Sequence, residues 1–372
     1  MASFTQLSKY NWQVVISLGY DENGKKNRVK KQGFKNKKEA EIFVTEILSK
    51  RNKGYITPST NNIILKDFIL QWFNDYKCNT LGINTKNNYL SGINYHIIPK
   101  LGHYKLTDIT NIIVQNFYNS LINDKKLAPA SAKKIIEILN NCFNYAKKNK
   151  LIYNVPTDIE KMKLEKPRID YWNKEDIDFF LNEIRDNYIY SPVFISLLTG
   201  LRIGEICGLK WSSVDLDNGY ITVCSQVIQD KLNKQLILSD VLKTSTSYRS
   251  ISIPNILVNH LTALRELDID NINDFVIKDR NGGMATPRNI SMEFSKKVSK
   301  YKNLKQITFH SLRHTHATIL IFNGENIKVV SDRLGHKDIS VTLNTYTHVM
   351  EDMKKNTASL LDKIFDNKIS SF

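Results

Sequence analysis

The chain has 372 residues, enough for two or three domains with their own cores, and its 53 Lys and Arg against 37 Asp and Glu give a net charge of +16. This excess favours a polyanionic partner such as a nucleic acid, although a solvated basic surface or compositional drift towards Lys and Asn gives the same count. The four cysteines form no CxxC pair, which argues against disulfides or a cysteine metal site. No apolar run reaches the roughly 20 residues that span a bilayer and no signal peptide is evident, so we expect a cytosolic protein that does not bind membranes.

The first sixty residues are predicted to form a small basic domain of a sheet and one helix, with twelve Lys or Arg against five acidic residues. Alternating residues from Trp12 to Leu18 predict a strand, and Arg28 to Phe34 predict a second strand after a turn. Asn36 and Glu39 form a capping-box pattern before a helix. The candidates for DNA contact on or near this hairpin are Lys25, Lys26, Arg28, Lys30 and Lys31.

Residues 63–160 are predicted to form an all-helical bundle. Apolar stripes predict four helices, from Leu65 to Tyr76, Thr85 to Ile97, Thr110 to Leu121 and Ser131 to Lys148, of which the second should stop at Pro99. We interpret the aromatic residues on these stripes as core rather than as platforms for stacked bases. Five lysines are candidates for phosphate contacts: Lys86, Lys125, Lys126, Lys133 and Lys134. Each of them, taken alone, is better explained as ordinary surface charge.

A third domain is expected from residue 171 to residue 372, after a linker at 161–170 that contains Pro167. A helix is predicted from Lys174 to about Arg185. The apolar run that follows breaks at Thr199 and Gly200, so that Arg202 stands where a new helix begins, and a helix N-terminus is itself an anion site.

Three alternating segments then predict a three-stranded antiparallel sheet from Tyr220 to Ile228, Gln235 to Val241 and Arg249 to Ile253. Lys243 falls in the turn between the last two strands, where a mobile lysine could protonate a leaving oxygen, and Lys231 and Lys234 in the other turn compete for this role.

The last quarter of the chain gathers residues that suit phosphate chemistry: His310, Arg313, His336 and, ten residues later, Tyr346. A guanidinium matches phosphate oxygens bidentately, and a phenol beside cations is a candidate nucleophile because positive neighbours favour its ionised form. His310 and His314 have the spacing of a metal pair, but no third ligand is evident and Arg313 would repel a cation, so we expect no metal.

These segments resemble the conserved boxes of one family, the tyrosine recombinases or lambda-type integrases. HSLRH resembles their His-x-x-Arg box, LGH stands ten residues before a Tyr, and TGLRIGEICGLKW (Thr199 to Trp211) and KTSTSYRSI (Lys243 to Ile251) precede them in the family's order. The resemblance implies an α+β multidomain fold: an arm-type DNA-binding domain at 1–60 with a three-stranded sheet, a helical core-binding (SAM-like) domain at 63–160, and a mainly α catalytic domain at 171–372 with a three-stranded antiparallel sheet.

The resemblance also implies a function, site-specific DNA recombination that integrates or excises a mobile element such as a phage genome. Tyr346 would attack a scissile phosphate to form a 3′-phosphotyrosyl link and release a 5′-hydroxyl. Arg202 and Arg313 would neutralise the non-bridging oxygens, and Lys243 would protonate the leaving oxygen. The covalent link conserves the energy of the phosphodiester, so no cofactor is required.

The remaining roles are those of a base, a hydrogen-bond donor and a supporting acid. His310 is the base chosen for Tyr346, His336 would donate a hydrogen bond to the phosphate, and Glu205 would orient Arg202 from the same helical face, although Glu205 could also be a buried structural acid.

The implied partners are double-stranded DNA at core and arm sites, three further copies of the chain in a homotetramer, and accessory proteins such as an excisionase or a host DNA-bending protein, in the bacterial cytoplasm on the nucleoid. An apolar stripe in the tail could dock on its own domain or on a neighbour: Leu360, Leu361, Ile364 and Phe365. Two alternatives stay open, a type IB-like topoisomerase and a non-catalytic DNA-binding regulator. The target sequence and the kind of element are not readable here.

Overall fold

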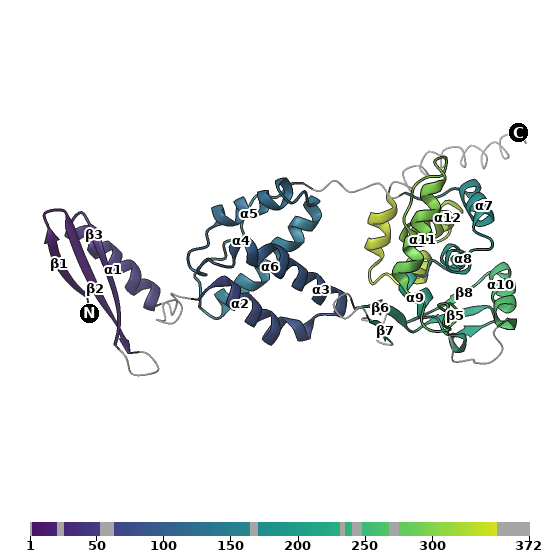
Figure 1. Ribbon diagram of the computed structural model, residues 1–372, viewed down its shortest axis with the longest axis horizontal. Helices are drawn as coiled ribbons and strands as arrows, with labels where there is room; N and C mark the ends of the chain where they lie inside the picture. Colours follow the sequence, from purple (N-terminus) through teal and green to yellow (C-terminus); the bar gives the residue numbers. More distant parts are fainter. Residues whose placement is uncertain are drawn as a thin grey trace, which may run out of the picture. The chain divides into compact units, whose positions relative to one another are not determined.

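The computed structural model describes residues 2–20, 26–52, 63–163, 170–230, 235–239, 248–267 and 275–347 (Figure 1). The chain divides into two compact units, residues 1–165 and residues 166–372, and each is described by itself. Among the described residues no helix combines the length and the apolar character needed to cross a membrane.

The N-terminal part is a three-stranded antiparallel sheet in the order β1-β2-β3, with α1 against one face (Figure 1). Its elements are β1 (Ala2–Ser8), β2 (Asn11–Tyr20), β3 (Lys26–Phe34) and α1 (Lys37–Asn52). Half of the expected capping box is present: Glu39 donates its backbone N–H to Asn36 Oδ1 at 2.9 Å, but Glu39 Oε2 accepts from the backbone N–H of Lys35, at 2.8 Å, rather than from that of Asn36. The residue pattern did not predict β1, because its apolar residues do not alternate: Phe4 packs with the core while Leu7 is exposed.

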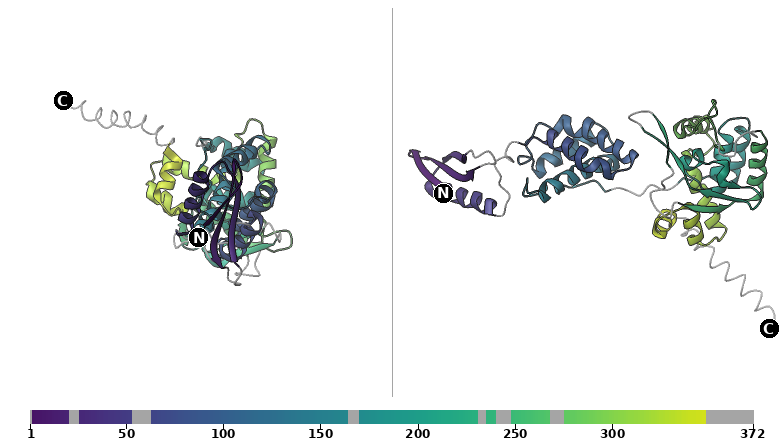
Figure 2. Two further views of the ribbon diagram at one scale, coloured as in Figure 1. Left: turned by 90° about the vertical axis from the view of Figure 1, so that its left-hand side faces the viewer. Right: turned by 90° about the horizontal axis from the view of Figure 1, so that it is seen from below.

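The helices of residues 65–148 form one bundle (Figures 1 and 2). The first two predicted helices each contain a π-helical turn and are therefore built from several short segments, whereas the other two are continuous. The segments are α2 (Leu65–Trp72), η2 (Phe73–Lys77), η3 (Cys78–Thr80), α3 (Ile83–Gly92), η4 (Ile93–Ile97), α4 (Ile98–Leu101), α5 (Asn111–Asn123) and α6 (Pro129–Lys148).

The expected stop at Pro99 was wrong, because the helix continues to Leu101. The π-helical turn η4 shifts the backbone hydrogen-bond register immediately before Pro99. Pro99 thus enters the first turn of α4, where the N–H that proline lacks is not required.

After α6 the chain returns to α5. The side chain of Gln115 makes two hydrogen bonds with the backbone of Glu160: its Nε2 donates to the Glu160 oxygen at 3.1 Å, and its Oε1 accepts from the Glu160 nitrogen at 2.8 Å. The Tyr118 hydroxyl accepts from the backbone nitrogen of Met162 at 3.1 Å. The start of the predicted linker is therefore fastened to the bundle.

The second unit is mainly helical and carries two short sheets. Its elements are α7 (Lys174–Glu183), α8 (Tyr190–Thr199), α9 (Ile203–Cys207), η5 (Trp211–Ser213), β4 (Val214–Asp215), β5 (Tyr220–Val223), β6 (Gln226–Gln229), β7 (Leu236–Ser239), β8 (Arg249–Ser252), α10 (Asn255–Glu266), α11 (Pro287–Lys300), α12 (Phe309–Phe322), α13 (Ile327–Leu334) and a last helical segment at 339–347.

A three-stranded antiparallel sheet is present, but its strands differ from those expected. The segment from Tyr220 to Ile228 is two strands, β5 and β6, interrupted at Cys224 and Ser225. The interruption has a physical cause, because the Ser225 hydroxyl donates to the Gly208 oxygen at 2.7 Å and so holds the chain against the end of α9. As a result β5 pairs with β4 and β8, while β6 pairs with β7 in a separate hairpin.

Trp172 anchors the start of this unit to its core. Its ring is fully buried, with ring centroids of Phe180 and Phe294 at 4.8 and 5.7 Å. Its backbone nitrogen donates to Thr315 Oγ1 at 3.1 Å and its indole nitrogen to the Lys305 oxygen at 2.8 Å. The chain therefore enters this unit bonded directly to α12.

Replacing Gly200 with alanine should destabilise the second unit by about 3 kcal/mol, and Gly324→Ala by only about 1 kcal/mol. Both glycines have positive φ, 70° and 83°, but a Cβ on Gly200 would lie 2.8 Å from both His316 Cδ2 and Leu334 Cδ2, whereas a Cβ on Gly324 meets nothing within 4 Å. Calorimetry of the full chain measures both losses. Equal losses of unfolding free energy in the two variants would show that His316 and Leu334 move away from the added Cβ without an energetic cost.

Candidate active site

Helix α12 places Arg313 in the interior of the second unit, at 2% exposure. Its guanidinium donates to the Gly200 oxygen at 2.9 Å and to the Leu334 oxygen at 2.6 Å. These bonds join the turn before Arg202 to the end of α13. Burial and the charge of Arg202 lower the pKa of Arg313 to about 9, which leaves the group cationic at neutral pH.

Arg202 stands at the N-terminus of α9, as predicted, and is bonded to Glu205. Its backbone nitrogen donates to Glu205 Oε2 and its Nη1 to Glu205 Oε1, each at 2.9 Å. The Arg202 side chain is 37% exposed, so part of the guanidinium stays accessible. Glu205 is thus bonded to Arg202 in a way that orients its side chain. Glu205 is also buried, at 3% exposure, so both predictions made for it describe its position.

A second arginine, Arg249, binds Glu205 from β8. Its Nη2 and Nη1 lie 2.9 and 3.2 Å from the two carboxylate oxygens. Burial by itself would raise the pKa of Glu205, but the bonds and charge of Arg249, together with Arg202, lower it to about 2.

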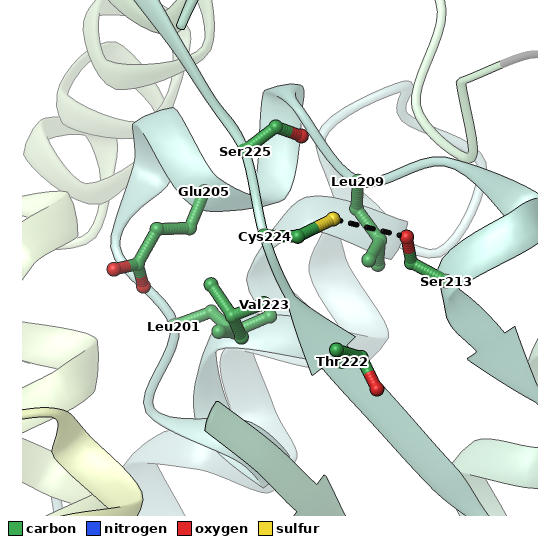
Figure 3. A pocket seen from close by; sticks show the side chains of 8 residues that line it. All are labelled: Leu201, Glu205, Leu209, Ser213, Thr222, Val223, Cys224 and Ser225. Atoms are coloured by element: carbon green, nitrogen blue, oxygen red, sulfur yellow. Dashed lines mark hydrogen bonds between the residues drawn. The ribbon is translucent and has the colours of Figure 1, made fainter. Parts of the chain in front are cut away.

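Behind Glu205 is a small hollow lined by both apolar and polar side chains (Figure 3). Cys224 points across it to Ser213, with the sulfur 3.2 Å from the hydroxyl oxygen, while the Glu205 carboxylate is turned away from it (Figure 3). The apolar side chains of Leu201, Leu209 and Val223 also line the hollow. The carboxylate thus binds its two arginines rather than facing this hollow.

Tyr346 lies in the helical segment 339–347 and is 1% exposed, packed with a small cluster from α12 and α13. Its hydroxyl lies 2.8 Å from His314 Nδ1. The expectation that cationic neighbours ionise this phenol does not hold in this conformation, because burial raises the pKa of Tyr346 more than Arg313 lowers it. The hydrogen-bond partner is also His314 rather than the expected His310.

His310 is exposed one helical turn before His314, with ring centroids 5.1 Å apart. Burial of part of the ring, then Arg313 and Arg202, lower the pKa of His310. Within the part of the chain that the structure describes, no group of three or more His, Cys, Asp or Glu could hold a metal ion.

His336 follows α13 directly, and its Nδ1 lies 2.8 Å from the Thr342 hydroxyl. Burial and the charges of Arg313 and Arg202 lower the pKa of His336 to about 4, so the ring is neutral at physiological pH. Lys243, the predicted general acid, lies outside the described residues, and so do Lys231 and Lys234, the two other candidates for this role.

His316 and Arg333 brace the site without having been predicted. His316 Nδ1 lies 2.7 Å from the Leu197 oxygen and therefore carries the ring proton, and its Nε2 accepts from Arg333 Nε at 3.1 Å. Burial and the charge of Arg333 lower the pKa of His316 to about 3. Arg333 also donates to the Leu198 oxygen at 3.1 Å. The end of α8 is thus tied to α12 and α13.

Two of the site residues that were not predicted, His314 and Arg249, could have been found from the sequence. His314 stands four residues after His310, on the same helical face, and Arg249 closes the KTSTSYRSI segment. The roles of His316 and Arg333 depend on contacts between residues far apart in the chain, and the sequence offers no signal for them.

The predicted basic residues of the N-terminal sheet lie on both of its faces. Arg28 and Lys30 pair with Ser17 and Val15, whereas Lys31 pairs with the buried Val14. Alternation along the strand thus puts Arg28 and Lys30 on the face away from α1. The Lys31 ammonium lies on the α1 side, 4.6 Å from the centre of the Phe43 ring. Lys25 lies outside the described residues, and Lys26 is placed only as backbone.

The lysines predicted in the helical bundle are all at its surface to some degree. Lys86 in α3 is half-buried, and the others are exposed, near the start of α6 or in the turn before it: Lys125, Lys126, Lys133 and Lys134.

Three family patterns match successive parts of the chain: the Arm DNA-binding domain at residues 6–50, the N-terminal SAM-like domain of phage integrases at residues 64–122, and the Phage integrase family at residues 171–353. A "Tyrosine recombinase XerC-like" protein of Caldanaerobacter subterraneus is 28% identical over 98% of both chains. The ICEBs1 integrase of Bacillus subtilis is 24% identical over 97% of this chain and 100% of its own. The transposase of transposon Tn916 from Enterococcus faecalis is 31% identical over 47% and 45%.

Two solved structures show the same fold. The Tn1549 transposon integrase in complex with transposon right end DNA matches with a TM-score of 0.69 and 20% identity, over 80% of this chain and 100% of its own. A lambda integrase dimer bound to a COC′ core site matches with a TM-score of 0.58 and 20% identity, over 75% and 97%. The predicted α+β fold class and the family resemblance are confirmed. The chain therefore belongs to the tyrosine recombinases of the phage integrase family, site-specific recombinases that cleave and rejoin DNA.

Proposed function

We propose that this recombinase integrates and excises a mobile element, with Tyr346 as the nucleophile. The observation that carries the proposal is the bond between Tyr346 and His314 beside the buried Arg313. A phenol, a neutral imidazole and two arginines are the parts that an in-line attack on a phosphodiester requires. The names of the relatives, an integrase and a transposase among them, support a mobile element as the substrate.

In this proposal, Arg202 and Arg313 bind the non-bridging oxygens as negative charge builds on them, and a 3′-phosphotyrosyl link forms while the 5′-hydroxyl leaves. His336 donates a hydrogen bond to the same phosphate. Lys243 protonates the leaving oxygen, a role carried over from the resemblance alone. The burial of Tyr346 keeps its hydroxyl from water until bound DNA shifts the segment 339–347.

The proposed assembly is a homotetramer on paired core sites, with the helical bundle and the catalytic unit binding the core DNA and the N-terminal sheet binding arm sites, in the cytoplasm on nucleoid DNA. The DNA-bound structures of the Tn1549 and lambda integrases support DNA as the partner. An excisionase or a host DNA-bending protein would bias the direction. Lysines at 86, 133 and 134 are proposed phosphate contacts of the bundle, supported by their charge and, for Lys133 and Lys134, by their exposure.

Tyr346→Phe should abolish covalent capture of a nicked duplex that carries the attachment junction of the element, since phenylalanine has no oxygen to attack with. Denaturing electrophoresis detects the adduct. Tyr188→Phe is the matched control, because Tyr188 is an exposed tyrosine of the same unit and its loss should leave the adduct intact. An adduct with Tyr346→Phe, or none with the wild type, contradicts the proposal. Relaxation of supercoils without recombinant joints would instead favour the topoisomerase alternative.

We propose His314, in place of His310, as the group that accepts the proton of Tyr346. With its proton on Nε2, His314 accepts at Nδ1, and burial, His310 and Arg313 lower its pKa to about 4, so its basic form is present above that pH.

His314→Ala should therefore slow adduct formation by about a hundredfold, and more than His310→Ala does. The wild-type rate should show no inflection from histidine protonation between about pH 7.5 and pH 5. Single-turnover cleavage at several pH values measures both. A larger loss with His310→Ala would return the role to His310, and a midpoint at the ordinary histidine pKa would contradict His314 as the group that accepts the proton.

Changing Arg28 and Lys30 together to alanine should weaken binding of the full chain to a DNA fragment from the end of the element. It should also reduce the slope of log K against log salt by about 2, because two phosphate contacts are lost. Lys31→Ala is the matched control and should leave the slope unchanged, since Lys31 lies over the Phe43 ring on the other side of the sheet. Equal effects of the two variants would show that the face away from α1 is not the DNA surface.

A further inference from the structure

Arg249 is a buried cation that the proposed reaction does not use. Its side chain is 7% exposed at the first position of β8. All three of its guanidinium nitrogens are bonded: Nη1 and Nη2 to the two oxygens of Glu205, at 3.2 and 2.9 Å, and Nε to the Arg333 oxygen at 2.8 Å. Burying a guanidinium loses hydration free energy, which the hydrogen bonds of Arg249 must offset. We therefore ask what these bonds do for the site.

The first purpose concerns charge. Glu205 and Arg202 alone would form a neutral pair, which would attract a phosphate weakly. Arg249 adds a second cation to the same carboxylate, so the three groups together carry a net positive charge. Glu205 can accordingly orient Arg202 while the group of three keeps a net positive charge that attracts a phosphate.

The second purpose concerns the backbone that carries His336. Arg249 Nε holds the Arg333 oxygen at the end of α13, and Gly335, with a φ of +67°, lies against the guanidinium. A Cβ at Gly335 would lie 2.9 Å from Arg249 Nη1, so the turn before His336 is shaped around this side chain. One residue therefore contacts both the acid that orients Arg202 and the turn that presents His336.

We propose that Arg249 is a positioning residue for strand cleavage: it holds Glu205, and through it Arg202, in the orientation that binds the scissile phosphate, and it fixes the turn that presents His336. The inference rests on the proposed function, because it requires Arg202 to bind that phosphate. Arg249 itself does not touch the substrate.

The test compares cleavage of two nicked duplexes, one with a native scissile phosphate and one with a methylphosphonate, which carries no negative charge there. Arg249→Lys keeps the charge but loses the paired contact, and Arg249→Met loses both. Each should slow adduct formation by at least about tenfold on the phosphate, with the affinity for DNA changed by less than about threefold. On the methylphosphonate the loss should shrink to less than about threefold, because there is no charge left for a misplaced Arg202 to neutralise. Arg185→Met, an exposed arginine of the same unit, is the matched control and should match the wild type on both duplexes.

Equal losses on the two duplexes, or a wild-type rate for Arg249→Lys on the phosphate, would overturn the proposal. Arg249→Met could fail to fold because it leaves Glu205 with one partner fewer, and circular dichroism detects this. In that case the double variant Glu205→Gln with Arg249→Met, which removes the carboxylate charge as well, takes its place with the same expected loss. Failure of the proposed function would look different, since the wild type would then form no adduct at Tyr346.

Discussion

The carboxylate of Glu205 is the interaction on which the rest of the site depends. A buried acid is unfavourable unless its charge is met, and here two arginines meet it, one from the start of α9 and one from β8. Because the two arginines come from segments 47 positions apart in the numbering, this one carboxylate fixes both Arg202, the proposed phosphate-binding arginine, and the edge of the sheet. The hydrogen bonds and charge of the two arginines lower the pKa of Glu205 to about 2, so the carboxylate stays ionised although it is buried.

A second layer of the site is built from backbone oxygens rather than acids. Arg313 binds the oxygens of Gly200 and Leu334, Arg249 binds that of Arg333, and Arg333 binds that of Leu198. A carbonyl satisfies a guanidinium without neutralising it, so these bonds leave the charge of each arginine in place, and it is the Glu205 carboxylate that partly offsets the charge of Arg249. The site is thereby rigid and strongly cationic, and its histidines stay neutral with pKa values near 4 or 3 for His314, His336 and His316. Neutral imidazoles can both accept and donate protons, as the proposed reaction requires.

If Tyr346 is the nucleophile, as proposed, its buried position would limit unwanted hydrolysis. The phenol is buried against α12 and α13, and burial raises its pKa, so it is a poor nucleophile as it stands. In the proposed function, the reaction therefore requires the helical segment 339–347 to move when DNA binds, which would prevent cleavage outside an assembled complex.

The sequence by itself determined the family, the fold class, the helices of the bundle and the positions of Arg202, Arg313, His336 and Tyr346, because these depend on local periodicity and on short motifs. Tertiary structure alone decided which histidine meets the tyrosine, which strands pair, and which face of the N-terminal sheet holds Arg28 and Lys30. The division of Tyr220 to Ile228 into two strands follows from one hydrogen bond to Gly208, and the role of Arg249 from contacts with residues 44 and 84 positions away. Such contacts arise only when distant segments pack, and burial then sets the charge of each group, which no local pattern encodes.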